Sequence, residues 1–110
     1  MDERDYEKAF QLILKAGNAK SAAMMAVEAA REGDYEKADS LLADCDREMH
    51  EAHDLQFEMI QKEAAGDHVE LNIVLVHAQD HLTMALMARD NAQEFIRLYQ
   101  MLDELKKDRP

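Results

Sequence analysis

The sequence predicts an all-α protein that folds as an antiparallel three-helix bundle. The 110 residues include only three glycines and one proline, so few positions are available for turns. Alanine, leucine, methionine, glutamate and lysine dominate the composition, which is typical of long helices. Two Gly-Asp pairs, Gly33-Asp34 and Gly66-Asp67, separate three segments in which apolar residues recur at helical spacing.

Each Gly-Asp pair supplies a glycine that can end one helix and an aspartate that can cap the next. The pairs predict helices over about residues 5–32, 35–65 and 68–107. Asp67 and Glu70 have the spacing of a capping box for the third helix. Because the connections are short, sequential helices should be antiparallel, and the length suits one domain over residues 1–110.

The first two predicted helices each carry one apolar stripe that should face the core. The first stripe contains Tyr6, Phe10, Ile13, Gly17, Met24 and Val27. Alanines make the second half of this helix thin, so a neighbouring helix can approach closely. The second stripe contains Ala38, Leu42, Cys45, Met49, Ala52 and Met59.

The third predicted helix differs because it carries two apolar stripes. One can pack on the other two helices: Leu71, Leu75, Ala78, Leu82, Ala85, Ala92, Ile96 and Tyr99. The other, which we call the seam, contains Ile73, His77, Asp80, Met84, Met87, Asn91, Glu94, Leu98, Met101 and Leu105.

The seam advances in alternating steps of four and three residues, which is a heptad repeat. A monomeric bundle needs only one buried stripe per helix, so the seam predicts a homo-oligomer with the third helix at its axis. Its polar members Asp80, Asn91 and Glu94 can specify register and the number of chains at a cost in stability.

Charge and cysteine content exclude several classes of function. The net charge of −11 argues against nucleic acid and against an anionic membrane surface as partners. No apolar stretch is long enough to insert into a bilayer, and the first five residues are charged rather than apolar. Cys45 is the only cysteine, which excludes an intrachain disulfide and indicates a cytoplasmic protein.

Two histidines within the apolar third helix are the candidates for chemistry. His77 and His81 are four residues apart and share one helix face, where Asp80 joins them. Imidazole titrates near neutral pH and is a competent nucleophile. From this spacing alone, structural histidines at an interface, a metal site and a nucleophilic site all remain open.

The metal interpretation lacks the usual motifs. None of the five histidines follows a glutamate by three residues, as ferritin-like sites require, and the chain has no His-Glu-x-x-His segment. The remaining histidines, His50, His53 and His68, are expected at the surface, with His68 in the first turn of the third helix. Cys45 is expected to be an inert core residue.

The segment Leu75–Leu82, with the sequence LVHAQDHL, resembles the phosphorylation-site segment of the lactose/cellobiose family of phosphotransferase-system enzyme IIA. Supporting segments are Gly17–Ser21, Ala29–Asp34, Glu51–His53 and Ile60–Ala64, so the resemblance covers about residues 6–105. It implies a trimer of three-helix subunits whose C-terminal helices form a parallel coiled coil.

The resemblance also implies a phosphoryl carrier in sugar uptake. His77 would accept the phosphoryl group from HPr as a phosphohistidine and pass it to a cysteine of a IIB protein, for uptake of a β-linked disaccharide through IIC. His81 would assist by a hydrogen bond to the phosphoryl oxygens, with Gln79 or Gln61 of a neighbouring subunit as further candidates. Lactose, cellobiose and chitobiose remain open as the sugar.

The resemblance further implies that Asp80 gathers near the threefold axis around a divalent cation, for which Mg²⁺ is the expected ion. Three carboxylates at one axis would repel one another, so a hard cation or partial protonation is expected there. The alternatives to a phosphoryl carrier are a non-catalytic helical trimer and a metal-binding helical bundle.

Overall fold

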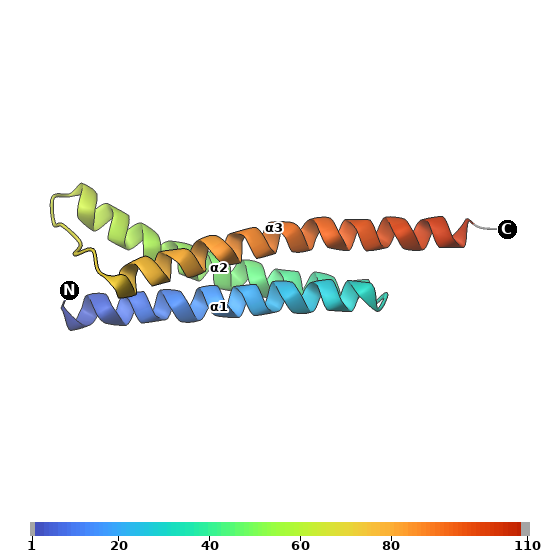
Figure 1. The fold of residues 1–110 in the computed structure, drawn as a ribbon, viewed down its shortest axis with the longest axis horizontal. Coiled ribbons are helices and arrows are strands. Elements are labelled where there is room, and N and C mark those ends of the chain that lie inside the picture. Colours follow the sequence, from blue (N-terminus) through green and yellow to red (C-terminus); the bar gives the residue numbers. More distant parts are fainter. Residues whose placement is uncertain (1, 109–110) are drawn as a thin grey trace.

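The computed structural model describes residues 2–108, which form three helices and no strand. The helices are α1 (Glu3–Arg31), α2 (Tyr35–Ala64) and α3 (Ile73–Lys107). Figure 1 shows α1 and α3 running in the same direction, whereas α2, which connects them in the chain, runs in the opposite direction. The described part is a rod of 66 × 20 × 20 Å. The predicted three-helix bundle is confirmed.

The first turn forms as its sequence predicts. Gly33 adopts a φ of +84°, a left-handed conformation that favours glycine. Asp34 then caps α2, because its side chain accepts a hydrogen bond from the backbone N–H of Lys37 at 3.1 Å. Gly66 likewise ends α2 with a φ of +90°. These two glycines therefore set where α1 and α2 end.

The start of α3 differs from the prediction by five residues, because α3 begins at Ile73 and not at residue 68. Its cap is Asn72, whose side chain accepts from the backbone N–H of Leu75 at 3.0 Å. Glu63 of α2 provides the reason. Its Oε2 accepts from the backbone N–H of Val69 at 2.9 Å and contacts His68 Nδ1 at 3.1 Å.

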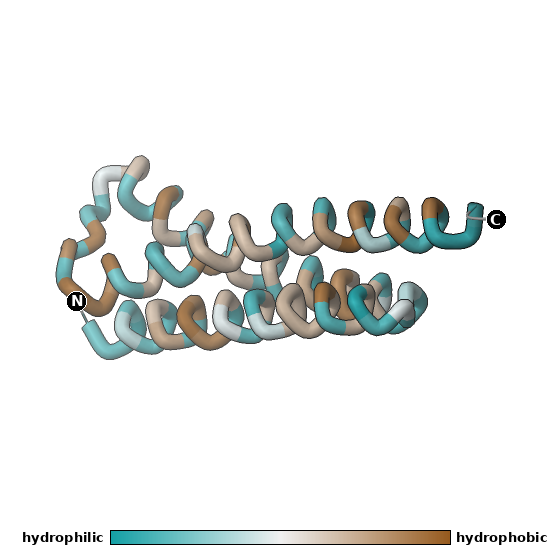
Figure 2. The backbone as a smooth tube through the Cα atoms, turned by 45° about the vertical axis from the view of Figure 1, so that its right-hand side comes forward, coloured by the Kyte–Doolittle hydropathy of each residue, from teal (hydrophilic) through white to brown (hydrophobic). Residues whose placement is uncertain are grey.

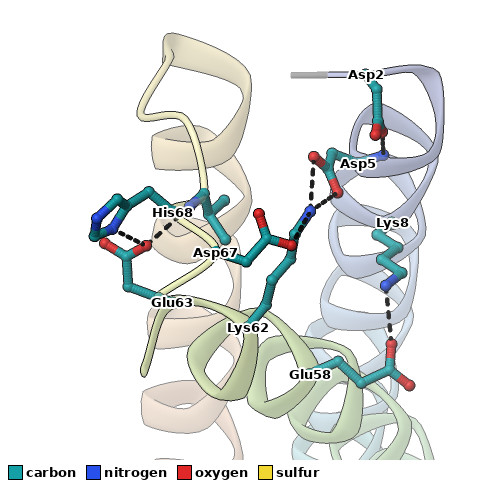
Figure 3. A network of polar contacts seen from close by, with 9 residues as sticks. Asp2, Asp5, Lys8, Glu58, Lys62, Glu63, Asp67 and His68 are labelled. Atoms are coloured by element: carbon teal, nitrogen blue, oxygen red, sulfur yellow. Dashed lines mark hydrogen bonds and ion pairs between the residues drawn. The ribbon is translucent and has the colours of Figure 1, made fainter. Parts of the chain in front are cut away.

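These contacts hold the residues before α3 in a loop, and Figure 3 shows them together. The hydrogen bond from Val69 is the main cause that lowers the pKa of the Glu63 carboxyl. Asp67 does not cap α3; its carboxylate instead lies 3.9 Å from Lys62 Nζ. His68 therefore lies in the connection and is exposed, so its placement in the first helical turn was wrong.

The core face of α1 also differs from the prediction. Tyr6, Phe10 and Met24 are exposed, and Phe10 and Met24 are 58% and 60% accessible. The buried face consists almost entirely of alanine: Ala9, Leu12, Ala16, Ala19, Ala23, Ala26, Ala29 and Ala30. Helix α1 packs against both other helices, and small side chains allow both of them to approach closely.

The predicted core faces of α2 and α3 are largely confirmed. In α2 every residue of the predicted stripe is buried except Met49, which is partly buried and packs against the core. In α3 the stripe from Leu75 to Ile96 is buried and Tyr99 packs against it. Leu71 is the exception, because it precedes α3 and is 80% exposed.

All ten residues of the seam are exposed in the single chain. Apolar members of the seam are among the most accessible large apolar side chains of α3, with Met87 at 65% and Leu105 at 64%. Helix α3 also extends past the turn between α1 and α2 (Figure 1), and Figure 2 shows hydrophobic residues recurring along this extension. The bundle therefore buries one stripe of α3 and leaves the other uncovered.

No helix in residues 2–108 combines the length and hydrophobicity needed to cross a membrane.

Two glycine substitutions should change stability in opposite directions. A Cβ added at Gly17 or at Gly33 meets no atom within 4 Å, so neither change creates a clash. Gly17 lies inside α1, where alanine is preferred, and Gly17→Ala should raise the free energy of unfolding by about 0.5–1 kcal/mol. Gly33→Ala should lower it by about 1–2 kcal/mol, because of the positive φ.

Urea unfolding followed by circular dichroism at one fixed protein concentration measures both changes. Shifts of the same sign in the two variants would contradict this account of the two positions.

Candidate functional site

The two histidines of the predicted site form a direct pair on α3. His77 Nε2 and His81 Nε2 lie 3.0 Å apart, and the rings meet edge to face with centroids at 4.5 Å. A hydrogen bond between two such nitrogens requires an N–H on one ring and a lone pair on the other. His77 is exposed and His81 is half-buried, so His77 is the member that an approaching protein can reach.

Asp80 lies beside the pair but is not bonded to it. The carboxylate is exposed on the seam and makes no hydrogen bond or ion pair with any residue from 2 to 108. Within the same range, no group of three or more histidine, cysteine or acidic residues could hold a metal ion. One chain alone therefore supplies a single free carboxylate at this point.

Gln79 faces a different direction from His77. It lies two positions further along the helix, which places it on roughly the opposite side. Its Oε1 accepts a hydrogen bond of 2.6 Å from Gln56 Nε2 of α2, and its backbone carbonyl accepts from Thr83 Oγ1 at 3.1 Å. Gln61 is exposed on α2. Within one chain, neither glutamine is joined to the histidine pair.

The hydrogen bond between Gln56 and Gln79 could not be predicted from the sequence. The bond joins residues that are 23 positions apart on different helices, and an isolated glutamine on a helix surface carries no pattern. Its presence follows only from how α2 packs beside α3. A contact of this kind depends on how each helix is rotated about its own axis. The spacing of hydrophobic residues determines this rotation only approximately.

His50 and His53 lie on α2 beside a separate groove. This groove between α2 and α3 has a volume of about 650 Å³, and its apolar lining comes from Met49, Leu82 and Leu86. His50 Nε2 is 3.5 Å from Asp54 Oδ2, and the His53 ring stacks on Phe57. His68 pairs with Glu63 in the connection. The structure therefore confirms that these three histidines are at the surface and separate from the His77–His81 pair.

Cys45 does not contribute to the site. The side chain is fully buried in the core, and this burial raises the pKa of its thiol to about 11. A thiol with this pKa is protonated at neutral pH and a poor nucleophile. The expectation of an inert core cysteine is confirmed.

Known proteins share this arrangement of helices. Residues 7–100 match the family model described as "PTS system, Lactose/Cellobiose specific IIA subunit". The lichenan-specific phosphotransferase enzyme IIA component of Bacillus subtilis is 44% identical over 104 residues, covering 94% of both chains. A lactose-specific EIIA component of Streptococcus mutans is 37% identical over 91 residues, covering 83% of this chain and 88% of the relative.

Solved structures agree with the sequence relatives. The crystal structure of the PTS cellobiose-specific enzyme IIA from Bacillus anthracis superposes with a TM-score of 0.91 at 41% identity, covering 94% of this chain and 95% of that one. The chitobiose IIA in its complex with HPr from Escherichia coli gives 0.80 at 32% identity, covering 94% and 99%. The match across nearly all of the chain shows that this protein belongs to the lactose/cellobiose-specific IIA subunits of the phosphotransferase system.

Proposed function

We propose that this chain is the phosphoryl carrier of a sugar phosphotransferase system, acting through a phosphohistidine at His77. The main support is that His77 is exposed at the surface of α3 and that its Nε2 lies 3.0 Å from His81 Nε2. Family membership supports the relay, since the matching model describes a IIA subunit of this system. The relay would operate in the cytoplasm, where a lone thiol such as Cys45 stays reduced.

HPr is the proposed donor and a IIB cysteine the proposed acceptor. The structure of a relative in complex with HPr supports the first assignment. The names of the relatives cover lichenan, lactose, cellobiose and chitobiose, which supports a β-linked sugar as the final acceptor. Relatives with similar sequence identity to this chain are named after different sugars. The proposal therefore names the class of sugar and not one particular sugar.

The histidine pair suggests how the transfer proceeds. If His81 donates its Nε2–H, His77 carries its proton on Nδ1 and a lone pair on Nε2. That lone pair attacks phosphorus as the bond between phosphorus and the HPr imidazole breaks, and the HPr ring recovers its electron pair. In the second transfer, the IIB thiolate forms a sulfur–phosphorus bond and the bond to His77 Nε2 breaks, restoring the neutral ring.

His81 takes part without carrying the phosphoryl group. When phosphorus occupies His77 Nε2, the N–H of His81 loses its acceptor there and can turn to a phosphoryl oxygen about one bond length further away. Phosphoryl transfer depends mainly on positioning and on neutralising the charge of these oxygens. A charge-assisted hydrogen bond from a ring that is already in place meets both needs.

The exposed seam supports a homotrimer as the working form. Six of its ten residues are apolar: Ile73, Met84, Met87, Leu98, Met101 and Leu105. A monomer would leave this stripe in water along the whole of α3, whereas a parallel coiled coil would cover it. His77 lies near the N-terminal end of the same stripe. Trimerisation would therefore bring the three phosphorylation sites to one end of the coiled coil, where the helices must leave His77 accessible for HPr to reach it.

Asp80 fits a divalent cation only in such a trimer. Three copies would supply three carboxylates at one layer of the axis, and Mg²⁺ accepts oxygen ligands and retains water at its other positions. Asp80 is suited to this because no residue from 2 to 108 of its own chain neutralises it. The bound ion would offset repulsion among the carboxylates and would take no part in the transfer steps.

His77→Ala should abolish phosphoryl acceptance and leave the helical circular dichroism unchanged. The chain is incubated with phosphoenolpyruvate, enzyme I and HPr, and its intact mass is measured. His50→Ala, which changes an exposed histidine of α2, is the matched control and should gain one phosphoryl group. A mass gain in His77→Ala equal to that of the control would refute the assignment and favour the non-catalytic alternative.

His81→Ala should still reach full phosphorylation, but slowly. A hydrogen bond to a charged acceptor is worth roughly 1.5–3 kcal/mol. If it acts only in the transition state, its loss slows transfer by about ten- to 150-fold. Quench-flow transfer from phospho-HPr measures the rate. A wild-type rate would reduce His81 to a packing residue, and complete loss of phosphoprotein would make it essential.

Asp80→Leu should raise the melting temperature by several degrees and remove any dependence on Mg²⁺, since an apolar residue replaces mutually repelling charges. Asp39→Leu, on the exposed face of α2, should do neither. Light scattering should give a trimer for all three proteins. If a chelator leaves wild-type melting unchanged and Asp80→Leu melts lower, Asp80 does not lie at an axis.

A further inference from the structure

The seam contains a second acidic residue, and its surroundings differ from those of Asp80. Glu94 lies two heptads after Asp80, at the same heptad position. The Asp80 carboxylate has no partner among the described residues of its chain, whereas Glu94 Oε1 accepts a hydrogen bond of 2.8 Å from Arg97 Nη1. Both side chains of this pair are mostly exposed in the single chain, at 69% and 61%. The pair lies on and beside the seam, which is exposed to water in the single chain and would be covered in the proposed trimer.

We propose that Glu94 and Arg97 form a self-neutralised charged layer between copies of this chain, which fixes their parallel, in-register alignment. The occupant of this surface is a second and third copy of α3. The inference rests on the trimer of the proposed function and adds to it the residues that choose the alignment.

The first step of the argument is the charge within one layer. In a parallel, in-register coiled coil, identical residues meet, so three Glu94 carboxylates would approach one another at the axis. Carboxylates in such a layer lose water and repel one another, which is unfavourable unless cations accompany them. Each chain already supplies the cation, because Arg97 is bonded to Glu94 before any association.

The second step is the position of Arg97 beside the seam. It immediately precedes Leu98, a seam residue, so its side chain flanks the interface instead of filling it. A guanidinium presents five N–H donors in one plane. One Arg97 can therefore serve its own Glu94 and a carboxylate of the neighbouring chain. The carboxylates of this layer would therefore be neutralised without a metal ion, in contrast to those of the Asp80 layer.

The third step compares other alignments. A slip of one heptad between parallel chains would place Glu94 beside Met87 or Met101, where its carboxylate would be buried against apolar side chains. Asn91, the seam residue before Glu94, would be misplaced in the same way. The correct alignment keeps these polar residues together, so the pair disfavours slipped assemblies.

The experiment removes the positive charge of Arg97 and then also the negative charge of Glu94 that it neutralises. Arg97→Gln leaves three unpaired carboxylates in the layer, and its trimer should dissociate at a protein concentration at least about tenfold above the wild-type value. Glu94→Gln combined with Arg97→Gln removes both charges and should recover most of this loss. Sedimentation equilibrium across a dilution series measures all the proteins, in Mg²⁺ and again in a chelator.

Arg47→Gln is the matched control. Arg47 pairs with Asp44 at the same spacing of three residues and is similarly exposed, but it lies on α2 away from the seam. It should dissociate at the wild-type concentration. Arg97→Gln indistinguishable from Arg47→Gln would overturn the proposal, as would failure of the double variant to recover.

Failure of this inference is distinguishable from failure of the proposed function. A wild-type protein that sediments as a monomer at every concentration would remove the trimer itself. A wild-type trimer that is insensitive to Arg97→Gln would remove only the charged layer. Phosphoryl gain by intact mass should persist in all variants, because none of these residues contacts His77 or His81.

Discussion

The close packing of the alanine face of α1 against both other helices is the contact on which the rest of the molecule depends. Ala16, Ala19, Ala23 and Ala26 are fully buried there. Because these side chains are short, α1 can contact α2 and α3 along its length, and one stripe of α3 suffices to complete the core. The opposite stripe of α3, with His77, therefore remains available for other chains.

The features that the sequence predicted well are those set by spacing along one helix. The heptad steps of the seam, the core stripe of α2 and the turn at Gly33-Asp34 all depend on residues close in sequence. The predicted core face of α1 was wrong at Tyr6, Phe10 and Met24, which have larger apolar surfaces than the buried alanines, whereas Ile13 and Val27 of the same prediction do pack against the core. A prediction from hydrophobicity places large residues in the core. In the structure, two helices pack closely on α1, and mainly small side chains fit between them.

Tertiary contacts account for the other differences. Glu63 captures the backbone of Val69, and this sets the start of α3 at Ile73. Lys62 lies between Asp5, at 3.2 Å, and Asp67, and so joins α1 to the end of α2 and to the connection (Figure 3). The helical spacing of His77 and His81 was readable from the sequence, but the Gln56–Gln79 bond beside them required the packing of α2 on α3.

The parallel course of α1 and α3 has a consequence for the order of folding. Arg31, at the end of α1, donates to Tyr99 of α3, and the hydroxyl of Tyr35, at the start of α2, donates to Asp103; each contact joins residues 68 positions apart. Helices α1 and α2 are joined by a tight turn, so their pairing closes a far shorter loop. We expect this hairpin to form first and to offer a shallow alanine-lined trough on which α3 condenses. Assembly of the proposed trimer would then follow the docking of the last helix, because the seam that would contact other copies lies on α3.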